Sequence, residues 1–147
     1  MSTVVKTAAI VAILRLFHKE GPFMAVGEFW TPIVAVCIGL TFIIGNLSAA
    51  VQSSVKRMLA FSSISHAGFL LLAIVAVSYG TPKAIIFYTI AYSVASIVAF
   101  TVLINIIRVT GGDAIENFNG LGKKSPLLAV VMCIALLSLA GIPPTAG

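Results

Sequence analysis

The sequence predicts an all-α fold, a polytopic transmembrane helical bundle of about five helices. Hydrophobic residues make up 60% of the 147-residue chain and charged residues only 9%, and the mean hydropathy is +1.15. A chain of this composition could not keep its apolar surface out of water, so it is an integral membrane protein. No segment shows the alternation that marks membrane β-strands of roughly ten residues, so the spans are helices.

Length and polarity place the helices at about residues 1–17, 32–51, 58–78, 84–107 and 126–147. The first is short, whereas each of the three middle segments can span a core of about 30 Å at about 1.5 Å per residue. A capping residue followed by proline marks three helix starts, at Thr31-Pro32, Thr81-Pro82 and Ser125-Pro126. The last helix is expected to break at Pro143 and Pro144, because proline has no amide donor.

Basic residues at the helix ends predict the orientation. The loops after the second and fourth helices hold five of them, Lys56, Arg57, Arg108, Lys123 and Lys124. The opposite side holds three, Arg15, Lys19 and Lys83. The positive-inside rule therefore puts Lys56 in the cytoplasm or its organellar equivalent. Because loop charge accounts for most of the net charge of +5, no nucleic-acid partner is needed to explain it.

Cysteine usage and short motifs exclude several kinds of site. Cys37 and Cys133 are the only cysteines, and both lie inside apolar segments. No Cys/His spacing suits a metal ion or an iron–sulfur cluster, and there is no glycine-rich phosphate loop. If the chain belongs to a redox enzyme, we expect the redox centres on other subunits.

Two titratable residues are predicted to lie near the middle of the membrane. Lys6 precedes Arg15 by nine residues, roughly 14 Å along a helix. His66 follows Met58 by eight residues, roughly 12 Å from the other edge. A charge is retained at this depth only for a reason, and a buried lysine is sensitive to nearby charge, as a proton carrier must be. The alternatives are that Lys6 snorkels to the surface and that His66 is a packing residue.

Hydroxyl groups accompany these residues. Ser62 and Ser63 precede His66 by four and three positions, within reach of its ring or of a shared water. One face of the fourth helix carries four more polar side chains, Thr89, Tyr92, Ser93 and Ser96. This face could hold waters between Lys6 and later groups, or it could form interhelical hydrogen bonds of about 0.6 kcal/mol each. The sequence favours neither over the other.

Three stretches of the chain carry a family resemblance: STVVKTAAIVAILRLF (Ser2 to Phe17), TFIIGNLSAAVQSSVKRMLAFSSISHAGF (Thr41 to Phe69) and SLAGIPPTAG (Ser138 to Gly147). In order and spacing they resemble the quinone-side antiporter-like membrane subunit of respiratory complex I, NADH:quinone oxidoreductase. This subunit is called subunit N in bacteria and subunit 2 in mitochondria and plastids. The resemblance implies a 14-helix antiporter-like fold, of which this chain would be helices eight to twelve, with Met1 internal.

The resemblance also implies a function, a redox-driven proton pump that couples quinone reduction to proton transfer. Lys6 takes the position of the family's mid-membrane lysine, with His66 and waters completing a relay. The resemblance also favours a hinge in the ion path at Pro143 and Pro144 over a packing kink. The family's glutamate of helix five and its lysines of helices seven and twelve would lie outside this chain, so the relay would lack both neighbours of Lys6.

The resemblance further implies that this chain binds no cofactor, because NADH, FMN, iron–sulfur clusters and quinone would be used by other subunits. The expected partners are other membrane subunits of complex I, including a neighbouring antiporter-like subunit, and the lipid bilayer of a bacterial inner membrane. Two alternatives remain: a subunit of a multisubunit cation/proton antiporter without electron transfer, and a segment that only scaffolds its neighbours. A lysine in helix twelve beyond Gly147 would favour the redox subunit, and a glutamate there the antiporter.

Overall fold

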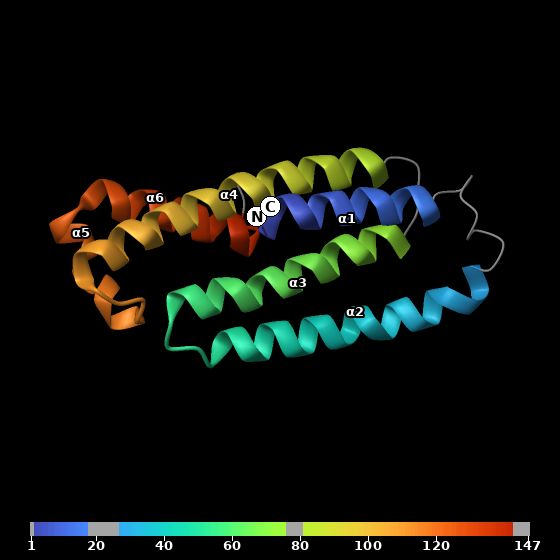
Figure 1. The fold of residues 1–147 in the computed structure, drawn as a ribbon, viewed down its shortest axis with the longest axis horizontal. Coiled ribbons are helices and arrows are strands. Elements are labelled where there is room, and N and C mark those ends of the chain that lie inside the picture. The colour runs from blue at the N-terminus through green and yellow to red at the C-terminus, as the bar shows by residue number, and fades with distance from the viewer. Residues whose placement is uncertain (1, 18–26, 76–80, 143–147) are drawn as a thin grey trace. The chain divides into compact units, whose positions relative to one another are not determined.

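The computed structural model describes residues 2–17, 27–75 and 81–142, and nearly all of these residues are helical (Figure 1). The long helices are α1 (Ser2–Phe17), α2 (Gly27–Ala50), α3 (Val55–Val75), α4 (Thr81–Thr110) and α6 (Pro126–Ala140). Between α4 and α6 lie a 3₁₀ turn, η2 (Ile115–Phe118), and a single helical turn, α5 (Leu121–Lys124). The described part of the chain contains no β-strand, which confirms the all-α prediction.

Three of these helices are long and apolar enough to cross a membrane. Their candidate spans are Phe29–Ala50 in α2, Val55–Val75 in α3 and Lys83–Thr110 in α4. A shorter apolar helix follows at Pro126–Ala140. A membrane-spanning helix needs about 20 apolar residues, so these lengths agree with an integral membrane protein.

The helix starts correct one detail of the sequence prediction. α2 begins at Gly27, so Pro32 lies inside the helix and Thr31 is not its cap. Proline lacks one amide donor, and near a helix start this removes a single backbone hydrogen bond. The other two prolines stand in first turns. Thr81, the expected cap before Pro82, is itself the first residue of α4. Pro126 directly follows the N-cap residue Ser125, although the Ser125 side chain makes no capping bond.

Glycine marks the ends of α4 and α6. Gly111 adopts φ 77° after α4, and its amide donates to the Ile107 carbonyl at 2.8 Å. Gly141 adopts φ 73° after α6, which ends at Ala140. Both are left-handed conformations that glycine adopts without a steric penalty. The predicted break at Pro143 and Pro144 lies outside the described residues.

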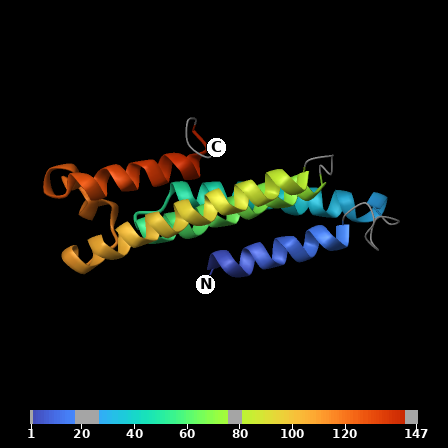
Figure 2. The ribbon, with the colours of Figure 1, turned by 90° about the horizontal axis from the view of Figure 1, so that it is seen from above.

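The chain divides into two compact units, and α3 and α4 each contribute to both. The first unit comprises Met1–Val51 and Ala60–Ile86, and the second comprises Gln52–Leu59 and Phe87–Gly147. In the first unit α2 and α3 run antiparallel (Figures 1 and 2). Its buried apolar side chains include Ile38, Leu70, Ile74 and Ile85.

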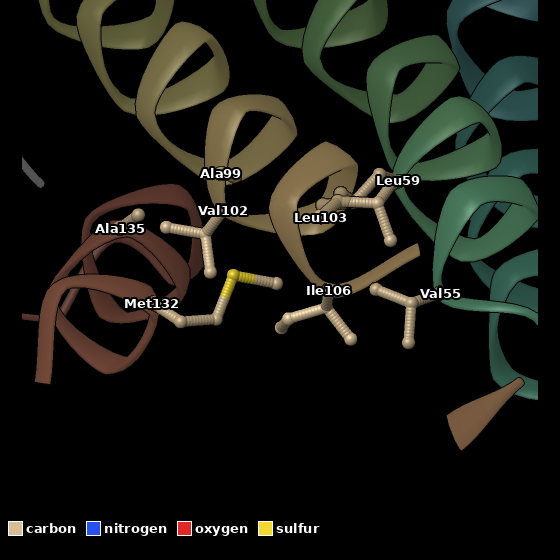
Figure 3. Close-up of a cluster of buried hydrophobic side chains, with 8 residues drawn as sticks. All are labelled: Val55, Leu59, Ala99, Val102, Leu103, Ile106, Met132 and Ala135. Atoms are coloured by element: carbon tan, nitrogen blue, oxygen red, sulfur yellow. The ribbon is translucent and has the colours of Figure 1, made fainter. Parts of the chain in front are cut away.

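The second unit has a contiguous apolar core, centred on α4 (Figure 3). Leu103, at 1% exposed, is its most deeply buried large side chain. It packs with residues from the start of α3, from α4 and from α6, namely Val55, Leu59, Ala99, Val102, Ile106, Met132 and Ala135. This core fixes the first turn of α3 against α4 and α6.

Candidate functional site

The polar residues of α3 provide the best-defined candidate site in the first unit. Ser65 and His66 are 5% and 9% exposed, respectively, in the middle of an apolar span. Polar side chains inside a membrane are retained where protein or water can satisfy them. The burial of His66 therefore agrees with a role inside the protein and excludes a side chain directed at lipid.

Ser65 is tied to the neighbouring helix. Its hydroxyl donates a hydrogen bond of 2.8 Å to Oδ1 of Asn46 on α2. Gly45 makes this approach possible: a Cβ there would lie 2.5 Å from Ser65 Oγ and 3.2 Å from the Ser65 amide nitrogen. Real Cβ contacts are essentially never as short as 2.5 Å, so the hydrogen bond between Ser65 and Asn46 requires a glycine at position 45.

A second close approach of the two helices lies one turn along α3. A Cβ at Gly68 would lie 3.2 Å from the ring of Phe42 and 3.3 Å from the Thr41 methyl group. The rings of Phe42 and Phe69 meet edge to face at 4.7 Å between centroids. Small residues that let helices approach closely are typical of helix pairs in membranes. Here Gly45 leaves room for the backbone of α3, and Gly68 leaves room for the Phe42 and Thr41 side chains of α2.

The serines that the sequence singled out before His66 are half-buried. Ser63 donates to the carbonyl of Ala60 in its own helix at 2.6 Å, and Ser62 lies one residue away on the same turn. Ser62 and Ser63 thus lie within one turn of His66 on α3, and their bonding to its ring or to a shared water stays a prediction. The Ser65 hydroxyl crosses to another helix.

The polar face predicted on the fourth helix belongs to the second unit. Ser96 is 6% exposed, and Thr89, Tyr92 and Ser93 are half-buried. The burial of this face is compatible with interhelical hydrogen bonds and with a row of waters. Lys6 lies within α1, but its side chain is outside what the structure describes.

Asn46 is the residue of the Ser65 and Asn46 pair that the sequence alone did not point to. The available signal was the amide of Asn46, a costly side chain near the end of an otherwise apolar span. Its partner could not be identified from spacing, because the two residues lie on different helices.

A separate polar cluster holds the start of α3 in the second unit. The Ser54 hydroxyl donates to Oδ2 of Asp113 at 2.6 Å and accepts from the Arg57 amide at 3.2 Å. Two backbone bonds reinforce it, from the Val55 amide to the Asp113 carbonyl and from the Ile115 amide to the Ser53 carbonyl, each 2.9 Å. Ser54 thus acts as the N-cap of α3, and the Asp113 loop holds the cap in place.

The described residues offer no arrangement for metal chemistry. No group of three or more His, Cys, Asp or Glu side chains in ranges 2–17, 27–75 and 81–142 could hold a metal ion. Cys37 and Cys133 are both exposed thiols. What the structure shows around Ser65 and His66 is a buried polar pair with a hydrogen bond from Ser65 to α2.

Comparison with known proteins gives the family. The entire chain, residues 1–147, matches the family described as "NADH:quinone oxidoreductase/Mrp antiporter, TM". It is 44% identical over 142 residues to NADH-quinone oxidoreductase subunit N of Heliobacterium modesticaldum, covering 97% of this chain and 30% of that protein. It is 43% identical over 150 residues to subunit N of Chloroflexus aggregans, covering 100% of this chain and 30% of that protein. The chain thus spans about 30% of the length of these relatives.

Proposed function

Because this chain belongs to the membrane family shared by NADH:quinone oxidoreductases and Mrp antiporters, we propose that it is part of subunit N, a proton-translocating membrane subunit of an NADH:quinone oxidoreductase. The observation that carries the proposal is the buried pair of Ser65 and His66 within the apolar span of α3. Such groups are expensive in hydrocarbon and mark ion paths in membrane proteins.

In the proposed mechanism Lys6 and His66 exchange protons through water near the middle of the membrane. An imidazole ring can accept a proton at one nitrogen and donate one from the other, so His66 can pass a proton between neighbouring waters. Lysine can lose its proton when its surroundings change, whereas arginine stays charged. The hydroxyls of Ser62 and Ser63 and the polar face of α4 support waters along the path, and Pro143 and Pro144 provide its hinge.

The partners and cofactors follow from this assignment. Electron transfer takes place on other subunits, which use NADH, FMN, iron–sulfur clusters and quinone, and this chain binds none of them. It assembles with other membrane subunits of the complex, including a neighbouring antiporter-like subunit. The bacterial origin of the relatives is consistent with a bacterial inner membrane.

The second candidate is a subunit of a multisubunit cation/proton antiporter, because the matching family includes Mrp antiporters. The relatives described above favour the first candidate, since both are named NADH-quinone oxidoreductase subunit N. The two candidates differ in whether NADH oxidation drives proton movement.

The test uses Lys6→Ala, Lys6→Arg and His66→Ala in the full-length subunit. All three complexes should assemble, yet pumping per NADH oxidised should fall, including in Lys6→Arg, because arginine does not release its proton. The measurement is proton pumping and NADH:quinone turnover in membranes matched for subunit content by blotting. Lys83→Ala is the matched control, because Lys83 is an exposed lysine at a helix start.

Full pumping in the Lys6 and His66 variants would reject the relay. A loss of assembly with normal pumping per assembled complex would make His66 a packing residue. Proton or cation exchange that persists without NADH oxidation would favour the antiporter.

A further inference from the structure

The Ser65 hydroxyl differs from several others in the apolar spans in where its proton points. Ser63 donates to the Ala60 carbonyl, Thr41 to the Cys37 carbonyl and Thr101 to the Ile97 carbonyl, each within its own helix. Ser65 instead donates across to Asn46 on α2. An amide side chain has therefore taken the place of the local backbone carbonyl as the acceptor.

This bond fixes what Ser65 can do chemically. A hydroxyl group has one proton to donate and two lone pairs that accept. With its proton committed to Asn46 Oδ1, Ser65 Oγ offers other partners only acceptor positions. Ser65 is 5% exposed, so these acceptor positions lie inside the protein, on the helix turn that carries His66.

The packing around the bond holds this orientation. Gly45 leaves the space that Ser65 Oγ occupies, since a Cβ there would be 2.5 Å away. The same Cβ would be 3.4 Å from the Phe61 carbonyl oxygen, the acceptor four residues before Ser65 in its own helix. The close backbone approach at Gly45 thus brings Asn46 near enough to compete with the Phe61 carbonyl for the Ser65 proton.

We propose that Asn46 is a positioning residue, which accepts the Ser65 proton and so fixes Ser65 as a hydrogen-bond acceptor on the buried turn of His66. This role rests on the proposed function, because it concerns the donors of the same relay. A water or a protonated group donates to Ser65 Oγ, and the proton does not continue to α2, because the amide oxygen of Asn46 accepts a hydrogen bond but is too weak a base to take up a proton. Asn46 and Ser65 together orient the hydrogen bonds beside His66 and prevent proton transfer from α3 to α2.

The test is a double-variant cycle in the full-length subunit: Asn46→Leu, Ser65→Ala and the two combined. The measurement is protons pumped per NADH oxidised, in membranes matched for subunit content. Asn46→Leu should lower this ratio about threefold, the bias in orientation that an average interhelical hydrogen bond in a membrane protein supplies. Ser65→Ala, which removes the acceptor itself, should lower the ratio at least as much. The combined variant should fall no further, because both changes remove the same bond.

Asn105→Leu is the matched control. Asn105 is also an exposed asparagine on an apolar span, but its amide donates at 3.1 Å to the Thr101 carbonyl of its own helix. Its replacement should leave the pumping ratio unchanged. An equal fall in Asn105→Leu and Asn46→Leu would overturn the proposal, because any lost amide would then have the same effect.

The other outcomes are also decisive. If the combined variant falls about threefold below Ser65→Ala, the effects are independent and Asn46 does not act through Ser65. If Asn46→Leu reduces only the amount of assembled complex, Asn46 is a packing residue. If Asn46→Leu does not assemble at all, the smaller change Ser65→Ala tests the proposal instead. A normal ratio of protons pumped per NADH oxidised in Ser65→Ala would reject the positioning role of Asn46.

Lys6→Ala and His66→Ala, measured in the same membranes, separate this proposal from the proposed function. When those two variants fail to pump and Asn46→Leu pumps normally, only the positioning role is lost. If Lys6→Ala and His66→Ala pump normally, the proposed relay is rejected, and the positioning role of Asn46 is rejected as well.

Discussion

Replacing Gly45 by alanine should weaken the pairing of α2 with α3. The new Cβ would lie 2.5 Å from Ser65 Oγ, 3.2 Å from the Ser65 amide nitrogen and 3.4 Å from the Phe61 carbonyl oxygen. Rotation of the Ser65 hydroxyl relieves the shortest contact but breaks its bond to Asn46. The backbone contact remains, so α3 must move away by a few tenths of an ångström.

The expected cost is the sum of these two effects. The lost interhelical bond costs about 0.6 kcal/mol on average in a membrane protein. An extra methyl group in a well-packed interface costs about 1 to 3 kcal/mol. Alanine also gains about 1 kcal/mol over glycine in helix propensity, which offsets part of the cost. The net effect of Gly45→Ala is therefore a loss of about 1 to 3 kcal/mol of stability.

Gly39→Ala provides the matched control in the same helix. A Cβ at Gly39 meets nothing within 4 Å, so this variant gains the propensity without the steric cost. Because the propensity effect is common to both variants, it cancels in their comparison, and they should differ by about 2 to 4 kcal/mol. The assay is unfolding of the full-length subunit in detergent by increasing SDS, followed by far-ultraviolet circular dichroism. Equal midpoints for the two variants would refute the close approach of α2 and α3 at Gly45.

Three further outcomes are expected. Asp113→Ala should cost about 1 to 2 kcal/mol of stability in the same unfolding assay, because it removes the carboxylate that holds the N-cap serine of α3. The control Glu116→Ala, at an exposed residue, should change stability by less than about 0.5 kcal/mol. Equal losses would show that the charge of the loop matters and the cap contact does not. Leu103→Ala should cost about 2 to 5 kcal/mol of stability, because Leu103 is 1% exposed in the core of the second unit. Ile104→Ala, at a residue that is 50% exposed, should cost much less. Similar losses for the two variants would contradict the assignment of the core. A cysteine placed near Lys56 should react with an impermeant thiol reagent from the cytoplasmic side only, and labelling from the opposite side would reverse the orientation.

Much of the fold could be predicted from local properties of the sequence. The apolar composition identified the membrane as the solvent, and the long apolar segments gave the helices, because hydropathy adds up residue by residue along one segment. The start of α2 was placed wrongly, since the rule for proline at a helix start was applied to Pro32, which lies inside the helix. Proline costs only one hydrogen bond there, and the apolar span of α2 tolerates it.

The candidate site could be predicted only in part. His66 was identified because a titratable residue in an apolar helix is rare enough to stand out by itself. Its burial fits a relay residue and a packing residue equally, so its role stays a prediction. The roles of Lys6 and of Pro143 and Pro144 stay predictions, because the Lys6 side chain and both prolines lie outside what the structure describes. The N-cap of α3 depends on Asp113, which is 59 residues away from Ser54, so no local pattern contains it.

The sequence by itself determined the solvent, the helical class and the segment that carries the polar cluster, because each of these depends on one stretch of chain. Only the tertiary structure decided which hydroxyl leaves its own helix and which side chain receives it. Ser65 meets Asn46 because α2 and α3 pair in one register and with one rotation about their axes. Gly45 and Gly68 permit that register, because a Cβ at Gly45 would meet the backbone of α3 and a Cβ at Gly68 would meet the Phe42 and Thr41 side chains of α2. Contacts between helices depend on shape across two segments at once, which the hydropathy of neither segment contains.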